Sequence, residues 1–158
     1  ELRGTLDLAT NSVPGRFGAA LELNGVDDEY VSLGDVGLYD LRRGLTVAAW
    51  FTVDAFGDGD ETLARKGDDA WRLKRDGTAP VLEFTCDGLL VGGGGEPHVQ
   101  GSRPVDDGAW HHAAGVYDGT ALYLYIDGVL DASAPASGNA RAVLSASRSS
   151  SAGLSPAA

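Results

Sequence analysis

The chain has 158 residues, of which 23 are acidic and 12 are Lys or Arg, so its net charge is −11. That length suits one domain that buries about two-thirds of the surface its unfolded chain exposes. The acidic balance argues against nucleic acid or membrane as a partner, because phosphate binding depends on clustered cations, and no apolar run is long enough to cross a bilayer. Cys86 is the only cysteine, which excludes an internal disulfide; its place within an apolar run predicts a buried, inert thiol.

Short apolar runs recur about every ten residues between Gly and Asp, a spacing typical of an all-β sandwich or barrel. The first sixteen residues predict one edge strand. Residues 15–35 then predict two short strands, at 19–23 and 29–33, joined by a loop at 24–28. The most apolar run, Leu45–Val53, predicts a central strand with Trp50 facing the core. Further short strands are expected near residues 61–65, 69–75, 79–86 and 88–91.

Residues 108–130 show the clearest pattern in the chain, with two Asp-Gly pairs at Asp118-Gly119 and Asp127-Gly128. Asp-Gly tolerates the positive φ angles that two-residue hairpin turns require. Between these pairs, Leu122, Leu124 and Ile126 alternate with Ala121, Tyr123 and Tyr125. This period of two is typical of a strand with a different environment on each side. The segment therefore predicts a three-strand meander at 112–117, 120–126 and 129–133.

After Asp131 the sequence becomes rich in Ala and Ser and holds no acidic or aromatic residue. Residues 141–146 still suit one strand. Residues 148–158 lack the apolar content to join a core, so we expect a disordered tail there and a single domain over residues 1–147.

Four blocks in this order resemble the laminin G-like jelly-roll family of the concanavalin A-like lectin and glucanase superfamily. They are GRFGAALELNGVDDEYVSLGD, LTVAAWFTVDAF, ETLARKGDD and GAWHHAAGVYDGTALYLYIDGVLDAS. The resemblance implies an all-β, two-sheet antiparallel jelly-roll sandwich. Members of the family usually end with a strand that closes the sandwich, and this chain has SASRSSSAGLSPAA in its place. We therefore expect the closing strand to be missing, and an open sheet edge would invite self-association.

The loop that holds Asn24, Asp27 and Asp28 is the best metal candidate. Calcium takes six to eight oxygen ligands, and a tight turn that contains Gly can present several carboxylate and amide oxygens together. The resemblance also points to calcium in this region. A solvated hairpin loop without a metal is the alternative interpretation.

Trp71 and Tyr123 are the candidate ligand-binding residues, because sugars stack their apolar faces on aromatic rings. Trp71 stands between polar residues, which predicts an exposed ring, and Tyr123 would line a sheet face together with Tyr125. Packing within the sandwich is the alternative for each. His111 and His112 are adjacent and so point to opposite faces of a strand, which argues against a shared metal.

The resemblance implies a non-catalytic recognition module of a larger extracellular protein that binds glycan or protein ligands, with calcium as a cofactor. The glucanases of the superfamily carry their acids in a Glu-x-Asp-x-x-Glu pattern. That pattern is absent, and Glu83 and Asp87 provide only two same-face acids without the third. Two alternatives stay open: an architectural spacer domain, and a glycoside-active enzyme with an atypical site.

Overall fold

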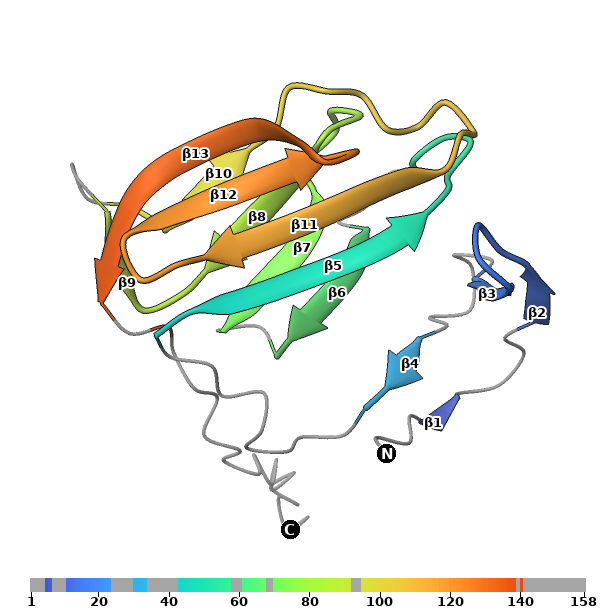
Figure 1. The fold of residues 1–158 in the computed structure, drawn as a ribbon, viewed down its shortest axis with the longest axis horizontal. Helices are drawn as coiled ribbons and strands as arrows, with labels where there is room; N and C mark the ends of the chain where they lie inside the picture. Colours follow the sequence, from blue (N-terminus) through green and yellow to red (C-terminus); the bar gives the residue numbers. More distant parts are fainter. Residues whose placement is uncertain are drawn as a thin grey trace, which may run out of the picture.

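A computed structural model gives the fold (Figure 1) and describes residues 5–6, 11–23, 30–33, 43–57, 61–67, 70–91, 95–138 and 140. All the regular secondary structure within these ranges is β-strand. No helix that could span a membrane is found in the described ranges.

Two antiparallel sheets lie face to face and form a sandwich, which confirms the predicted all-β fold class. The five-stranded sheet has the order β5-β11-β12-β13-β9 and the four-stranded sheet the order β10-β8-β7-β6. The first consists of β5 (Leu45–Phe51), β9 (Leu89–Val91), β11 (His111–Tyr117), β12 (Ala121–Ile126) and β13 (Val129–Gly138). The second consists of β6 (Thr62–Lys66), β7 (Trp71–Arg75), β8 (Leu82–Cys86) and β10 (His98–Gln100).

The core fills the space between the two sheets, and the predicted alternation along β12 is confirmed. Leu122, Leu124 and Ile126 are buried, whereas the tyrosines between them face outward and are half-buried. The alternate residues of β8 meet this layer from the other sheet and include Phe84 and Cys86, both fully buried. Burial raises the pKa of the Cys86 thiol to about 12, so it stays protonated and unreactive, as predicted.

The two Asp-Gly pairs behave differently. Asp127 and Gly128 both have positive φ, 53° and 78°, which confirms the predicted two-residue turn between β12 and β13. In the turn between β11 and β12, the positive φ falls on Gly119 alone. Asp118 instead accepts hydrogen bonds from the backbone of Thr120 and Ala121 through its carboxylate. It therefore caps the turn rather than forming its centre.

Strand β5 corrects two sequence-based predictions. It lies at the edge of the five-stranded sheet as described, with β11 beside it, and is not a central strand. Trp50 does not face the core and is 41% exposed. The cause is the period of two along the strand: Leu45 and Phe51 are buried on the inner face, so Trp50 must lie on the outer one.

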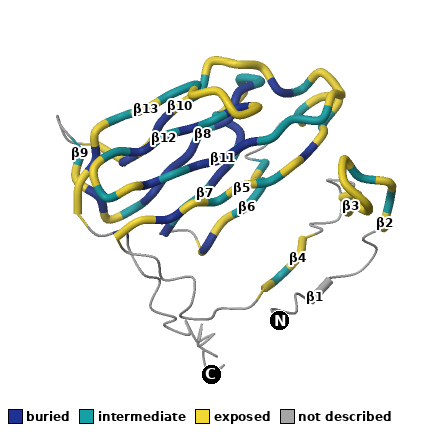
Figure 2. Tube along the Cα trace, viewed as in Figure 1, coloured by how far each residue is buried: buried dark blue, intermediate teal, exposed yellow. Residues whose placement is uncertain are grey.

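The N-terminal strands form two small sheets beside the sandwich (Figure 1). Strand β2 (Asn11–Pro14) pairs with β3 (Ala19–Glu22), and β1 (Thr5–Leu6) pairs with β4 (Val31–Ser32). The predicted strands at 19–23 and 29–33 thus exist, but each pairs with an earlier segment. Figure 2 shows the β2–β3 hairpin largely exposed and the burial concentrated in the sandwich.

Three predictions fall on residues outside the described part of the chain. They are the loop at 24–28, the strand at 141–146, and the region of the missing closing strand with the tail at 148–158. Self-association through an open edge in that region therefore stays a prediction.

Candidate ligand-binding face

Aromatic side chains gather on the outer face of the five-stranded sheet, and we call this set the aromatic face. Strand register places them there: Trp50 of β5 lies opposite His112 of β11, and Tyr125 and Tyr123 follow on β12. All four point away from the core, because the alternate residues of the same strands are turned toward it. The rings therefore line one sheet face across three neighbouring strands, β5, β11 and β12.

One end of the aromatic face is hollowed. Trp50, His112, Asp127 and Gly128 line a shallow, open hollow of about 340 Å³. The indole of Trp50 and the imidazole of His112 lie 5.2 Å apart at 55°, so the two rings form one wall. The Asp127 carboxylate, 42% exposed, supplies a polar group beside these rings. An exposed ring next to a fixed hydrogen-bond acceptor is suited to a ligand with an apolar face and hydroxyl donors.

The two tyrosines continue the aromatic face along β12. Their ring centroids are 6.3 Å apart. The Tyr123 hydroxyl donates to Asp118 Oδ2 at 3.1 Å, which holds the ring in place and raises the pKa of the phenol. Hydrogen bonds from the backbone N–H and the hydroxyl of Thr120 lower the pKa of Asp118 to about 2, so this carboxylate is ionised at neutral pH.

The tip of the β2–β3 hairpin meets the aromatic face at the same end as the hollow, beside Trp50. Phe17 contacts Trp50 edge-on, with centroids 5.4 Å apart at 79°. The Arg16 guanidinium carbon lies 5.4 Å from the Phe17 centroid and 5.5 Å from the Trp50 centroid. Both distances are within the range of a cation–π contact. The hairpin tip therefore supports Trp50 from the side of the sheet edge.

Beneath the hollow, His111 joins two carboxylates on the inner side of the sheet end. Its Nδ1 lies 2.8 Å from Asp127 Oδ2 and its Nε2 lies 3.1 Å from Asp107 Oδ1. Partial burial lowers the pKa of His111, but the hydrogen bonds to the two carboxylates outweigh burial and raise it above 6.5. Because both ring nitrogens are occupied, His111 has no free nitrogen with which to act as a base on a bound molecule.

The same contacts predict how stability depends on pH. Because the pKa of His111 is raised in the folded state, protonated His111 contributes to the free energy of unfolding. This contribution is fully present below pH 6.5 and is lost as the pH rises through the raised pKa. Burial raises the pKa of Asp127, but hydrogen bonds from the His112 backbone and His111 outweigh it and lower the pKa below 3.8. This second contribution is present above pH 3.8 and is lost as the pH falls.

We therefore expect this cluster to stabilise most between about pH 4 and pH 6.5. Urea unfolding of the wild type and of His111→Gln at pH 5 and pH 8 checks this. The variant should lose more stability at pH 5 than at pH 8. An equal loss at both pH values would show that the proton on His111 does not strengthen the contact.

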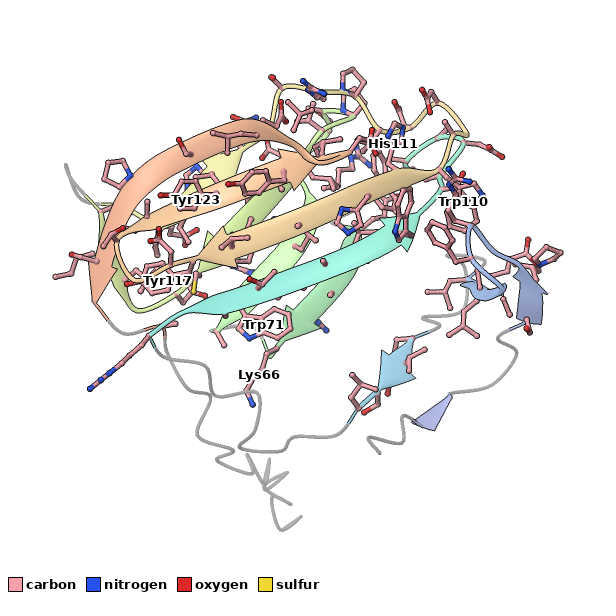
Figure 3. The ribbon with its side chains drawn as sticks, viewed as in Figure 1. Lys66, Trp71, Trp110, His111, Tyr117 and Tyr123 are labelled. Carbon is pink, nitrogen blue, oxygen red and sulfur yellow. The ribbon has the colours of Figure 1, made fainter. Side chains whose placement is uncertain are left out.

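The predicted ligand residues do not come together. Tyr123 lies on the aromatic face, whereas Trp71 lies on β7 in the other sheet and packs, partly buried, against the core. Figure 3 shows the two apart. Asn24, Asp27 and Asp28 lie outside the described residues. No group of three His, Cys, Asp or Glu side chains that could hold a metal occurs in the described ranges.

Sequence reasoning missed Trp50, His112 and Asp127 as a set. The sequence predicts Trp50 in the core because its strand is largely apolar on both faces. Asp127 was assigned to its turn alone, yet the same turn places its carboxylate beside the rings. The signal that could have found them is the register between β5 and β11, which the sequence does not show.

The two antiparallel sheets form the sandwich that the sequence blocks predicted. A laminin G family profile, described as the concanavalin A-like lectin/glucanases superfamily, matches residues 24–154. The chain therefore belongs to this superfamily, as its sequence blocks predicted. No curated protein matches the sequence.

Two solved structures are similar in fold. The binding domain of Paraclostridial Mosquitocidal Protein 1 aligns with a TM-score of 0.65 and 12% identity, over 89% of this chain and 40% of that one. Domain 4 of AbnA, a GH43 extracellular arabinanase from Geobacillus stearothermophilus, was solved with arabinotriose. It aligns with a TM-score of 0.61 and 22% identity, over 87% of this chain and 67% of that one. The chain thus spans less than half the length of the first of these solved chains.

Proposed function

We propose that this chain is a non-catalytic carbohydrate-recognition module and that the aromatic face binds the sugar. The observation that carries the proposal is the exposed Trp50 ring beside the Asp127 carboxylate. A sugar ring can stack on the indole while its hydroxyls donate to Asp127, whose orientation is fixed by His111 and by the His112 backbone N–H. The similar arabinanase domain, solved with arabinotriose, supports the same class of ligand.

Calorimetric titration with arabinotriose and with arabinan tests the proposal. We expect Trp50→Ala to weaken binding by about tenfold or more, because it removes the stacking ring. Tyr123→Ala should weaken it less. Trp71→Phe is the matched aromatic control on the other sheet and should leave binding unchanged. If Trp71→Phe weakens binding and Trp50→Ala does not, the ligand lies elsewhere than on the aromatic face.

The absence of catalysis is also part of the proposal. Glycosidases need two carboxylates across the scissile bond, and among the described residues Asp127 is the one carboxylate that lines the hollow. The nearby His111 has both nitrogens engaged.

We propose an extracellular location as well, in keeping with the extracellular arabinanase whose domain is similar. If no glycan binds, the apolar outer face suits an architectural role, packed against a neighbouring domain.

Calcium remains a proposal for Asn24, Asp27 and Asp28. Their carboxylate and amide oxygens have the chemistry that calcium prefers. A cation that binds only the folded state must raise the melting temperature by mass action. We expect a higher melting temperature in millimolar calcium than in chelator, and no difference in Asp27→Ala or Asp28→Ala. An unchanged melting temperature in the wild type would exclude a useful calcium affinity at this loop.

A further inference from the structure

We propose that the ligand of the aromatic face is an internal stretch of an extended, neutral polysaccharide, and that Phe17 is an additional stacking residue for it. This inference rests on the proposed function and adds the class of ligand. It starts from the tip of the β2–β3 hairpin, where Phe17 is 71% exposed although its edge contacts Trp50. Such exposure leaves a ring face open next to the hollow.

Phe17 is held in position rather than loosely attached. The hairpin is closed beside it by a hydrogen bond from the Gly15 N–H to the Gly18 carbonyl, 2.8 Å long, and Gly18 adopts a positive φ of 74°. The contact with Trp50 and the guanidinium of Arg16 fix the ring from two further directions. An exposed, immobilised ring costs little conformational entropy on binding, which suits it to stacking a ligand.

The rings extend too far for a single sugar. Trp50, His112 and Asp127 follow one another across β5, β11 and the end of β12, which spans about 10 Å at the usual strand spacing. Tyr123 lies four residues before Asp127 on β12, about 14 Å further along the strand. Phe17 adds one more ring to the aromatic face, beyond the edge of β5 and next to Trp50. A ligand that contacts Phe17, Trp50 and Tyr123 together must therefore be a chain of several sugars.

The surface between the rings is low. Ala48 of β5 and Ala114 of β11 are paired across the strands and face outward between Trp50 and the tyrosines. Each has a one-carbon side chain; Ala48 is exposed, and Ala114 is buried among its larger neighbours. These small residues add little bulk to the surface between Trp50 and the tyrosines.

The charges favour a neutral chain. Asp127 lies at the hollow and Asp118 at the Tyr123 end. Burial acts to raise the pKa of Asp127, but its hydrogen bonds outweigh burial, and hydrogen bonds also lower the pKa of Asp118, so both carboxylates are ionised at neutral pH. Arg16 is the cation in contact with the rings, and its guanidinium lies over Phe17 and Trp50. Two carboxylates, in a chain of net charge −11, would repel uronic acid units or sulfate groups.

The test compares linear arabino-oligosaccharides of three and six units, with xylo- and cello-oligosaccharides of the same lengths and an oligogalacturonate as further probes. We expect the six-unit neutral chain to bind more tightly than the three-unit chain. Phe17→Ala should weaken binding of the six-unit chain by about tenfold and reduce its advantage over the three-unit chain. Phe17→Tyr should restore binding. Leu21→Ala, which removes another exposed apolar side chain from the same hairpin, should have no effect.

The outcomes separate the two proposals. If the oligosaccharides bind and Trp50→Ala weakens them, but Phe17→Ala does not change the dependence on length, the extended-chain inference is wrong and the recognition function stands. Tighter binding of oligogalacturonate than of the neutral chains would overturn the neutral assignment. If none of the probes binds, the proposed function fails and the inference fails with it.

Discussion

Gly115→Ala is expected to lower the free energy of unfolding by about 3 kcal/mol, the upper end of what overpacking usually costs. Gly115 lies on the inner face of β11, and a Cβ added to it would stand 2.3 Å from Cδ2 of Phe84. That ring is fully buried in the facing sheet, so it has no free space to move into. Urea unfolding of both proteins, monitored by circular dichroism, measures the difference.

A double mutant tests the cause of this loss. Phe84→Leu shortens the side chain that the new methyl group meets, so it should relieve part of the strain while creating a smaller defect of its own. We expect Phe84→Leu/Gly115→Ala to be less destabilised than the sum of the two single variants. Strict additivity would mean that Gly115 and Phe84 do not meet between the sheets. A Gly115→Ala variant within about 0.5 kcal/mol of the wild type would contradict this packing altogether.

The core and the turn beneath the hollow could be predicted because their signals are local. Leu122, Leu124 and Ile126 repeat with a period of two within one strand, and Asp127-Gly128 follows directly. The local sequence of this strand therefore predicts both which of its residues face the core and where the strand ends. The recognition of the family rested on the same block and was confirmed by the match to residues 24–154.

The aromatic residues could not be assigned to a face in this way. In LTVAAWF both sets of alternate positions are largely apolar, so the alternation does not say which set is buried. For Trp71 the polar neighbours Arg72 and Lys74 suggested exposure. They point to the other face of β7, while Trp71 shares the inner face with the buried Leu73. A polar neighbour along a strand thus says little about the residue beside it.

Phe17 and Asp131 show a second limit, which is distance along the chain. Phe17 meets Trp50 across 33 residues of sequence, and the partners of Asp131 lie 28 and 29 residues before it. Both residues lie within blocks that resemble the family, but those blocks do not indicate these contacts. Their roles arise only when the strands assemble, so they could be found from the structure alone.

Asp131→Ala is expected to cost about 2–3 kcal/mol of stability, since hydrogen bonds to a charged group are among the stronger ones. The register between β12 and β13 shifts at Leu124/Tyr125, which leaves Asp131 as the extra residue of a β-bulge. The bulge turns its side chain toward the segment after β10, where it is only 3% exposed. There Oδ2 accepts the backbone N–H of Ser102 at 2.8 Å and that of Arg103 at 3.4 Å.

The Ser102 hydroxyl donates to Oδ1 at 2.8 Å, so one carboxylate ties the β10–β11 connection to β13. Alanine would leave these three donors without their carboxylate acceptor. Asp131→Asn keeps one acceptor oxygen and should lose about half as much, whereas Ser102→Ala, which removes a single donor, should cost about 1 kcal/mol. Urea unfolding ranks the three variants. If Asp131→Ala costs no more than Ser102→Ala, the backbone donors of Ser102 and Arg103 do not depend on this carboxylate.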